Sequence, residues 1–160
     1  MDTVFICPEI LKAEAEYDTL LQALPKCHTI QVSSSVYDRI AYRGGTEGVV
    51  ATIRMKEHGL DTLPKMPEGK APLYVVLESV EKPGNLGAIL RSADAAGVDA
   101  VIVCDPLTDL YNPNLIRSSL GGIFSVPTIA CTSQECIAYF KAQGIRILTA
   151  QLQDSSLYYD

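Results

Sequence analysis

The stretch Glu81-Lys-Pro-Gly-Asn-Leu-Gly-Ala-Ile-Leu-Arg-Ser-Ala-Asp-Ala-Ala-Gly97 decides how this chain folds. It opens with turn-forming residues, continues with the apolar spacing of a buried helix, and lies between the runs Leu73-Tyr-Val-Val-Leu77 and Ala100-Val-Ile-Val-Cys104. Such continuous apolar, β-branched runs are typical of strands covered on both faces of a parallel sheet. The sequence therefore predicts strands over 73–78 and 100–104, joined by a helix over 85–96.

Packing in the core does not explain why this predicted helix carries two particular polar side chains. Asn85 and Arg91 follow the first strand, and ligands bind to parallel α/β units at the carboxyl ends of the strands. A second polar segment, Tyr111-Asn-Pro-Asn-Leu-Ile-Arg-Ser-Ser-Leu-Gly-Gly122, follows the next strand and contains Asn114, Arg117 and Ser118. We therefore expect a functional site at this edge of the sheet.

Taken together, the two segments resemble the first two motifs of the SpoU/TrmH branch of the SPOUT RNA methyltransferases. These enzymes transfer a methyl group from S-adenosylmethionine to a ribose 2'-hydroxyl. The matching residues are Asn85, Arg91, Ala93-Asp94 and Gly97 in the first motif, and Asn112-Pro113, Arg117-Ser118 and Gly121-Gly122 in the second. The resemblance implies an α/β fold with the parallel sheet of the α/β-knot type, and a tRNA or rRNA 2'-O-ribose methyltransferase that forms a homodimer.

The resemblance also implies roles for individual residues. It makes Arg91 and Asn85 catalytic, with Arg91 nearest the reacting hydroxyl. Because a guanidinium stays protonated, with a pKa above ~12, orienting the hydroxyl or a phosphate is an easier role for Arg91 than acting as a base. The implied RNA-binding residues are Arg117, Ser118, Asn114 and Lys82, and the implied cofactor-binding residues are Thr149 and Ala150. From the residues alone, Asn85 reads as a helix cap, and Arg117 as the partner of an acidic residue, Asp105 or Asp109.

The resemblance and the composition divide the chain into three parts. Residues 1–56, with predicted strands near 4–7, 28–32 and 48–54 and helices over 13–24 and 33–41, resemble part of a small L30e-like RNA substrate-binding domain. Residues 57–71 are rich in Gly and Pro and are predicted to be a linker. Residues 72–160 resemble the SPOUT domain, with further predictions of a helix near 112–119, an extended piece over 124–130, a helix over 133–142 and a strand over 145–149.

The third motif of the family, a Gly-Asn-Glu-Gly loop followed by a Ser-Leu-Asn helix, is not found in the sequence. In the family this motif completes the cofactor pocket and much of the subunit interface. We therefore expect the domain to be incomplete at its C-terminus, and this chain alone to bind S-adenosylmethionine weakly and to lack activity.

Composition sets outer limits on these expectations. The 160 residues are 48% hydrophobic. They contain no apolar run long enough to cross a membrane, and the first residues lack the features of a signal peptide. These two observations predict a cytoplasmic protein. The net charge of −6 argues against binding nucleic acid through bulk charge. A local cluster of cations would still attract phosphates; the candidates are Arg39, Arg43, Arg54, Lys82, Arg91 and Arg117.

Cysteine spacing predicts no metal site. The five cysteines include no Cys-x-x-Cys pair, and Cys131 and Cys136 have no histidine nearby, so small buried thiols are the favoured interpretation.

Two other functions remain open from the sequence. Gly84-x-x-Gly87 and Asp105 partly imitate the glycine turn and ribose-binding acid of a dinucleotide-binding enzyme, although the full fingerprint is missing. The third alternative is a non-catalytic fragment that binds RNA or dimerises.

Overall fold

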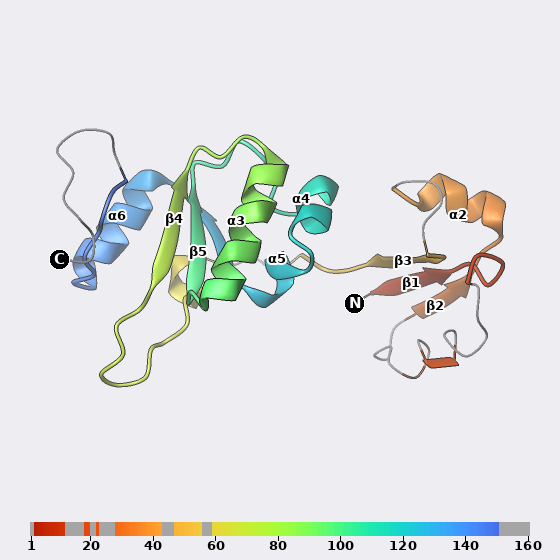
Figure 1. The fold of residues 1–160 in the computed structure, drawn as a ribbon, viewed down its shortest axis with the longest axis horizontal. Coiled ribbons are helices and arrows are strands. Elements are labelled where there is room, and N and C mark those ends of the chain that lie inside the picture. Colours follow the sequence, from red (N-terminus) through yellow and green to blue (C-terminus); the bar gives the residue numbers. More distant parts are fainter. Residues whose placement is uncertain are drawn as a thin grey trace. The chain divides into compact units, whose positions relative to one another are not determined.

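The computed structural model describes residues 2–11, 18–19, 22, 28–42, 47–55 and 59–150. The chain forms two compact units, which divide between Lys56 and Glu57 (Figure 1). The helix predicted over 13–24 lies almost wholly outside the described residues, as does Arg43.

The first unit contains a three-stranded mixed sheet. Strand β1 (Thr3–Ile6) lies between β2 (His28–Gln31), to which it is parallel, and β3 (Val49–Thr52), to which it is antiparallel. Alternate residues of β1, Val4 and Ile6, are fully buried. The helix α2 (Ser34–Ile40) contributes the buried Tyr37, whose hydroxyl accepts a hydrogen bond of 3.1 Å from the Gly48 amide. The three strands and the helix over 33–41 predicted for this unit are therefore present.

The second unit contains a parallel sheet in the order β4 (Tyr74–Glu78), β5 (Ala100–Cys104), β6 (Thr128–Cys131). All five residues of β5 are buried. Val101 and Val103 pack into the core on one face, and the alternate residues pack into the core on the other. The predicted parallel sheet is confirmed, and β5 is covered on both faces as predicted. The same prediction for the run over 73–77 is wrong, because β4 lies at the edge of the sheet and Val76 is exposed.

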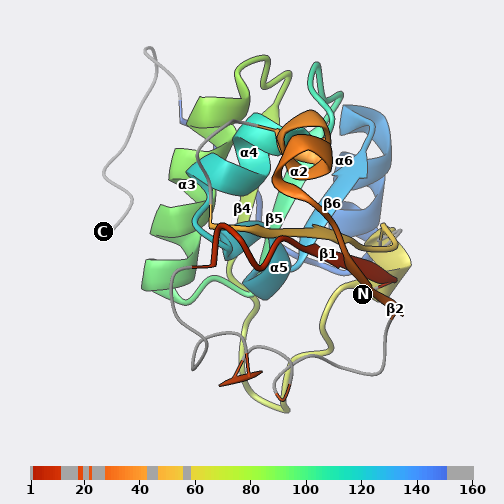
Figure 2. The ribbon, with the colours of Figure 1, turned by 90° about the vertical axis from the view of Figure 1, so that its right-hand side faces the viewer.

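Helices cover the two faces of this sheet. The helices α3 (Pro83–Ala96), α4 (Pro113–Ser118) and α5 (Gly122–Ser125) lie on one face, and α6 (Ser133–Ala142) lies on the other (Figure 2). Proline starts α3 and α4 in their first turns, where its missing N–H group costs nothing. Gly97 ends α3 in a left-handed conformation, with φ of 66°. Helix α6 begins with a capping box formed by Thr132 and Glu135.

One predicted extended segment is present in part and another is wrong. Within the piece predicted over 124–130, residues 128–130 belong to strand β6, whereas residues 124–125 belong to the short helix α5, because Gly121 takes a positive φ of 93° and turns the chain into a helix. Residues 145–149 form no strand, since a strand needs a hydrogen-bonded neighbour and not only apolar, β-branched residues.

The segment predicted to be a linker packs against the second unit at Leu60 and Leu63, whereas most of its residues from 65 to 71 are exposed. A 3-10 helix (Leu60–Thr62) precedes Leu63, which is buried in the same core cluster as Ile129 and Phe140. The following loop is fastened by Asp99, whose carboxylate accepts hydrogen bonds of 2.9 Å from the Leu73 amide and the Lys70 ammonium.

Candidate functional site

The carboxyl ends of β4 and β5 carry backbone strain. The next residues after these strands, Ser79 and Asp105, have φ of 52° and 46°, in the left-handed region that is costly for residues with a side chain. Their amides still extend the sheet by donating to the Cys104 and Cys131 carbonyls at 2.9 and 2.8 Å. Strained residues of this kind cluster at functional sites, so this edge is the candidate site.

The two sequence motifs meet where α3 packs against α4. A Cβ atom on Gly87 would lie 2.0 Å from Ser118 Oγ and 2.9 Å from the Ser118 carbonyl carbon, so the helices approach closely only because residue 87 is glycine. Ser118 Oγ in turn contacts the Leu115 carbonyl at 3.2 Å and the Pro83 carbonyl at 3.4 Å. The end of α4 is therefore locked to the first turns of α3.

Arg91 is held at this helix contact. Its guanidinium donates a hydrogen bond from Nη1 to the backbone carbonyl of Ser118, although the two residues are far apart in the sequence. The residue as a whole is exposed. A guanidinium has further N–H donors in a fixed plane, so one bond to the protein orients the others for a ligand.

Asn85 does not cap the helix. It is the third residue of α3, its side chain is exposed, and Lys82 occupies the N-cap position. The cap of the next helix is Asn112, whose side chain accepts a hydrogen bond of 2.9 Å from the Asn114 amide. Interpreting Asn85 as a cap is therefore wrong, and its amide is accessible near the carboxyl edge of the sheet.

The other predicted RNA-binding residues, Lys82, Asn114 and Arg117, are exposed. Among the described residues, Arg117 makes no ion pair with Asp105 or Asp109. Asp109 instead accepts a hydrogen bond of 2.8 Å from the Tyr111 amide.

Sequence reasoning missed a polar cluster at the same edge. Ser133 Oγ lies 2.6 Å from Asp105 Oδ2 and 3.1 Å from Glu78 Oε1, and the Ser133 amide donates to Asp105 Oδ2 at 3.1 Å. These hydrogen bonds hold the pKa of the Asp105 carboxyl below its usual range. The cluster joins the ends of β4 and β5 to the start of α6. The sequence could have indicated this cluster, because Glu78 ends one predicted strand, Asp105 follows another, and Ser133 starts a predicted helix.

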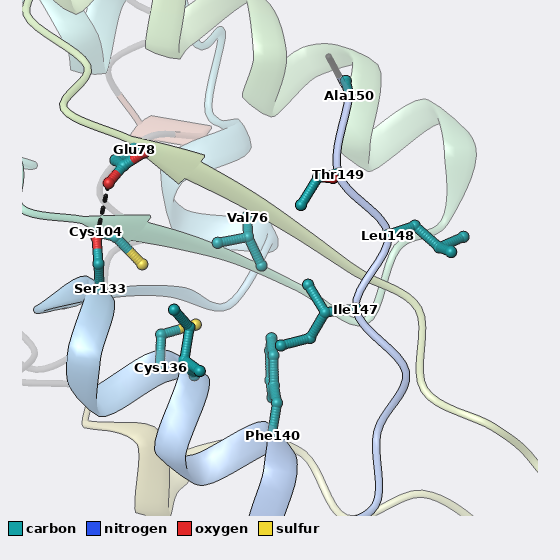
Figure 3. A pocket seen from close by; sticks show the side chains of 11 residues that line it. Val76, Glu78, Cys104, Ser133, Cys136, Phe140, Ile147, Leu148, Thr149 and Ala150 are labelled. Atoms are coloured by element: carbon teal, nitrogen blue, oxygen red, sulfur yellow. Dashed lines mark hydrogen bonds between the residues drawn. The ribbon is translucent and has the colours of Figure 1, made fainter. Parts of the chain in front are cut away.

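A pocket of about 360 Å³ lies beside this cluster, on the face of the sheet covered by α6 (Figure 3). Thr149 and Ala150, the residues predicted to bind the cofactor, line it. Its other walls are mainly apolar and are formed by Val76, Glu78, Cys104, Ser133, Cys136, Ile137, Phe140, Ile147 and Leu148. Arg91 and Ser118 do not line the pocket, because α3 and α4 cover the opposite face of the sheet.

Three cysteines gather beside the pocket, and two of them, Cys104 and Cys136, line it. The sulfur atoms of Cys104, Cys131 and Cys136 lie within 4.8 Å of one another. Burial, with a smaller contribution from the neighbouring Cys104, raises the pKa of Cys131 to about 12 and that of Cys136 to about 11. These thiols are therefore protonated and poor nucleophiles at neutral pH.

The fold and the pocket define an open, parallel α/β protein with a largely apolar site at the carboxyl ends of its strands, where proteins of this class bind their ligands. Within the described residues, no helix has the length and apolar character needed to cross a membrane. The model of the SpoU rRNA Methylase family matches residues 72–160. The chain belongs to this family.

Curated relatives and solved structures agree with the family. The 23S rRNA (guanosine(2553)-2'-O)-methyltransferase RlmP of Bacillus subtilis is 29% identical over 154 residues, which cover 96% of this chain and 58% of that protein. The 23S rRNA (guanosine-2'-O-)-methyltransferase RlmB of Xanthomonas campestris is 31% identical, covering 80% of this chain and 52% of that protein.

Two solved structures have the same fold over most of the chain. The SpoU methyltransferase AviRb from Streptomyces viridochromogenes, in complex with AdoMet, has a TM-score of 0.75 and 27% identity, covering 89% of this chain and 53% of that one. An rRNA methyltransferase from Sinorhizobium meliloti has a TM-score of 0.78 and 26% identity, covering 97% and 56%. The chain thus spans little more than half the length of the relatives that it matches.

Proposed function

We propose that this protein is an RNA 2'-O-ribose methyltransferase that uses S-adenosylmethionine and acts on rRNA or tRNA. The single observation that carries the proposal is the bond from the Arg91 guanidinium to the Ser118 carbonyl. It joins the two motifs that define the family and orients an exposed cation of α3 whose role the helix core does not explain. The names of the relatives support a ribosomal RNA substrate.

The pocket beside Thr149 and Ala150 fits the cofactor. Its volume of about 360 Å³ lies in the range of small-molecule sites, about 300–1,000 Å³. Apolar walls such as Val76 and Ile147 suit an adenine ring, and the Glu78 carboxylate can accept hydrogen bonds from hydroxyl or ammonium groups. When bound, S-adenosylmethionine supplies an electrophilic methyl group on a sulfonium.

The residues on α3 and α4 would bind and position the RNA. The task of Arg91 is to hold the ribose hydroxyl and an adjacent phosphate in line, because the guanidinium is a planar fork of N–H donors. Its bond to Ser118 reduces the freedom that must be lost on binding. The exposed amide of Asn85 lies at the start of the same helix and would contact the ribose. Lys82, Asn114 and Arg117 would bind phosphates or bases nearby.

The remaining parts of the proposal concern the rest of the protein. Residues 1–56 would act as an L30e-like substrate-binding module, residues 57–71 would connect it to the SPOUT domain of residues 72–160, and the active form would be a homodimer in the cytoplasm, where its RNA is found. The dinucleotide-binding alternative is not favoured, because the acid it needs, Asp105, is already bonded to Ser133.

Methyl transfer from radiolabelled S-adenosylmethionine to unmethylated rRNA tests the proposal, measured with a protein that contains this chain together with the third motif, because we expect this chain alone to lack activity. We expect Arg91→Ala and Arg91→Lys each to lower the rate at least about 100-fold, since misplacing the reacting groups costs this much, while calorimetry shows unchanged cofactor affinity. Lys141→Ala, an exposed change on α6, is the control and should keep full activity. Near-normal methyl transfer by a folded Arg91→Ala protein would show that Arg91 is not a catalytic residue.

A further inference from the structure

The three thiols beside the pocket have the arrangement of a ligand set. Cys104 and Cys131 end neighbouring parallel strands and are paired directly in the register of the sheet. Cys136 lies in the first turns of α6, on the face that packs against them. Cys104 and Cys136 are each only 2% exposed, and Cys131 is partly buried.

The separations of the sulfur atoms are close to those that a metal ion requires. Three sulfurs at about 2.3 Å from one ion lie about 4 Å from one another, and the sulfurs here all lie within 4.8 Å. Shifts of less than about 1 Å in side-chain position would therefore close the site around an ion. No His, Asp or Glu atom in the described part of the chain belongs to the group, so the donors are sulfur alone.

The backbone around the thiols is rigid. The Asp105 amide donates to the Cys131 carbonyl at 2.8 Å and thereby continues the pairing of β5 with β6 past the cysteines. The capping box of Thr132 and Glu135 fixes the start of α6, with the Thr132 amide donating to Glu135 Oε2 at 2.8 Å. A preformed set of ligands on two strands and a capped helix lowers the cost of ordering them around an ion.

We propose that Cys104, Cys131 and Cys136 bind one soft, thiophilic d10 cation. Thiolate ligands select Cu⁺ and Zn²⁺ over hard ions such as Mg²⁺ and Ca²⁺. Three sulfurs suffice for Cu⁺, whereas Zn²⁺ prefers four ligands and would take a water molecule from the pocket, which both Cys104 and Cys136 line. Each thiol that becomes a ligand releases its proton to solvent. The proposal is tested without measuring methyl transfer, so it can fail while the proposed function stands.

The test is a titration of the reduced, metal-free protein under anaerobic conditions. Zn²⁺ and Cu⁺ are added in separate experiments, and bound metal is measured by mass spectrometry after equilibrium dialysis. We expect one ion per chain and three sulfur neighbours by X-ray absorption spectroscopy. The chain retaining neither ion, or a bound ion surrounded only by oxygen and nitrogen, would overturn the proposal.

Variants separate this site from the other cysteines. Cys104→Ser, Cys131→Ser and Cys136→Ser should each weaken binding about 100-fold or more, because losing a ligand costs at least as much as losing the group that orients it. Cys7→Ala and Cys27→Ala are the matched controls and should bind as the unchanged protein does. Binding that survives in the triple variant would contradict the proposal.

A second measurement uses the unchanged protein, because a cysteine variant that does not fold would lose metal binding for another reason. Bound Zn²⁺ or Cu⁺ should raise the midpoint of urea unfolding of the unchanged protein, because an ion held by the folded ligands stabilises the folded state, whereas Mg²⁺ at the same concentration should leave the midpoint unchanged. Equal midpoints with and without Zn²⁺ and Cu⁺ would overturn the proposal independently of any mutant.

Discussion

At the scale of single residues, Gly87 decides how closely the two motif helices approach. We expect Gly87→Ala to destabilise the protein by about 1–3 kcal/mol, because the new methyl group would overlap Ser118 and force the helices apart. Chemical denaturation followed by circular dichroism measures this change. The same substitution should also reduce methyl transfer, since it displaces the carbonyl that holds Arg91.

Gly84, one turn earlier in α3, provides the control for this substitution. A Cβ atom there would have no neighbour within 4 Å, and its φ is not in the left-handed region. Gly84→Ala should therefore be neutral or stabilise the helix by up to about 1 kcal/mol. Equal losses of stability for the two alanine variants would show that the contact with Ser118 is not the reason for the glycine.

At the scale of elements, Asp99 ties the start of β4 to the loop before β5. The Leu73 amide, followed by the Lys70 ammonium, holds the pKa of the Asp99 carboxyl below its usual range. A carboxyl whose pKa is lowered on folding stabilises the protein above its unfolded pKa, near 3.8, and this stability is lost as the pH falls through the lower folded pKa.

The substitution Asp99→Asn tests this connection. It should lower the free energy of unfolding by about 1 kcal/mol at pH 7, and the difference from the unchanged protein should shrink below pH ~4. Urea titrations at pH 7 and pH 3 measure both values. Lys70→Ala should have a smaller effect, because the lysine is more than half exposed. A difference at pH 3 equal to that at pH 7 would contradict the role given to the carboxylate.

At the scale of the whole molecule, the net charge of −6 means that RNA must be attracted by local cations. We expect Arg117→Ala to weaken RNA binding and to reduce the slope of log K against log salt by about 0.7–0.9, the contribution of one phosphate contact. Fluorescence anisotropy with a labelled rRNA fragment, repeated at several salt concentrations, measures the slope. Lys141→Ala should leave the slope unchanged. An unchanged slope for Arg117→Ala would show that Arg117 does not contact a phosphate.

The sequence by itself determined the local elements and the family. Strand β5 and helix α6 have their predicted bounds, and helix α3 begins two residues before its predicted start. Apolar periodicity and turn residues are local properties, and they also imply a parallel sheet when strands and helices alternate. The motifs around Arg91 and Arg117 were likewise readable from their order and spacing. The roles of these side chains stay predictions.

Only the tertiary structure decided which distant residues meet. Residues 145–149 read as a strand, but pairing depends on a neighbour that local sequence does not specify. The bond between Arg91 and Ser118 requires α3 and α4 to pack at Gly87. Cys104 joins Cys131 and Cys136 because β5 and β6 run parallel in register and α6 folds back over both. Long-range contacts of this kind follow from how the layers pack, so a rule based on spacing along the chain does not detect them.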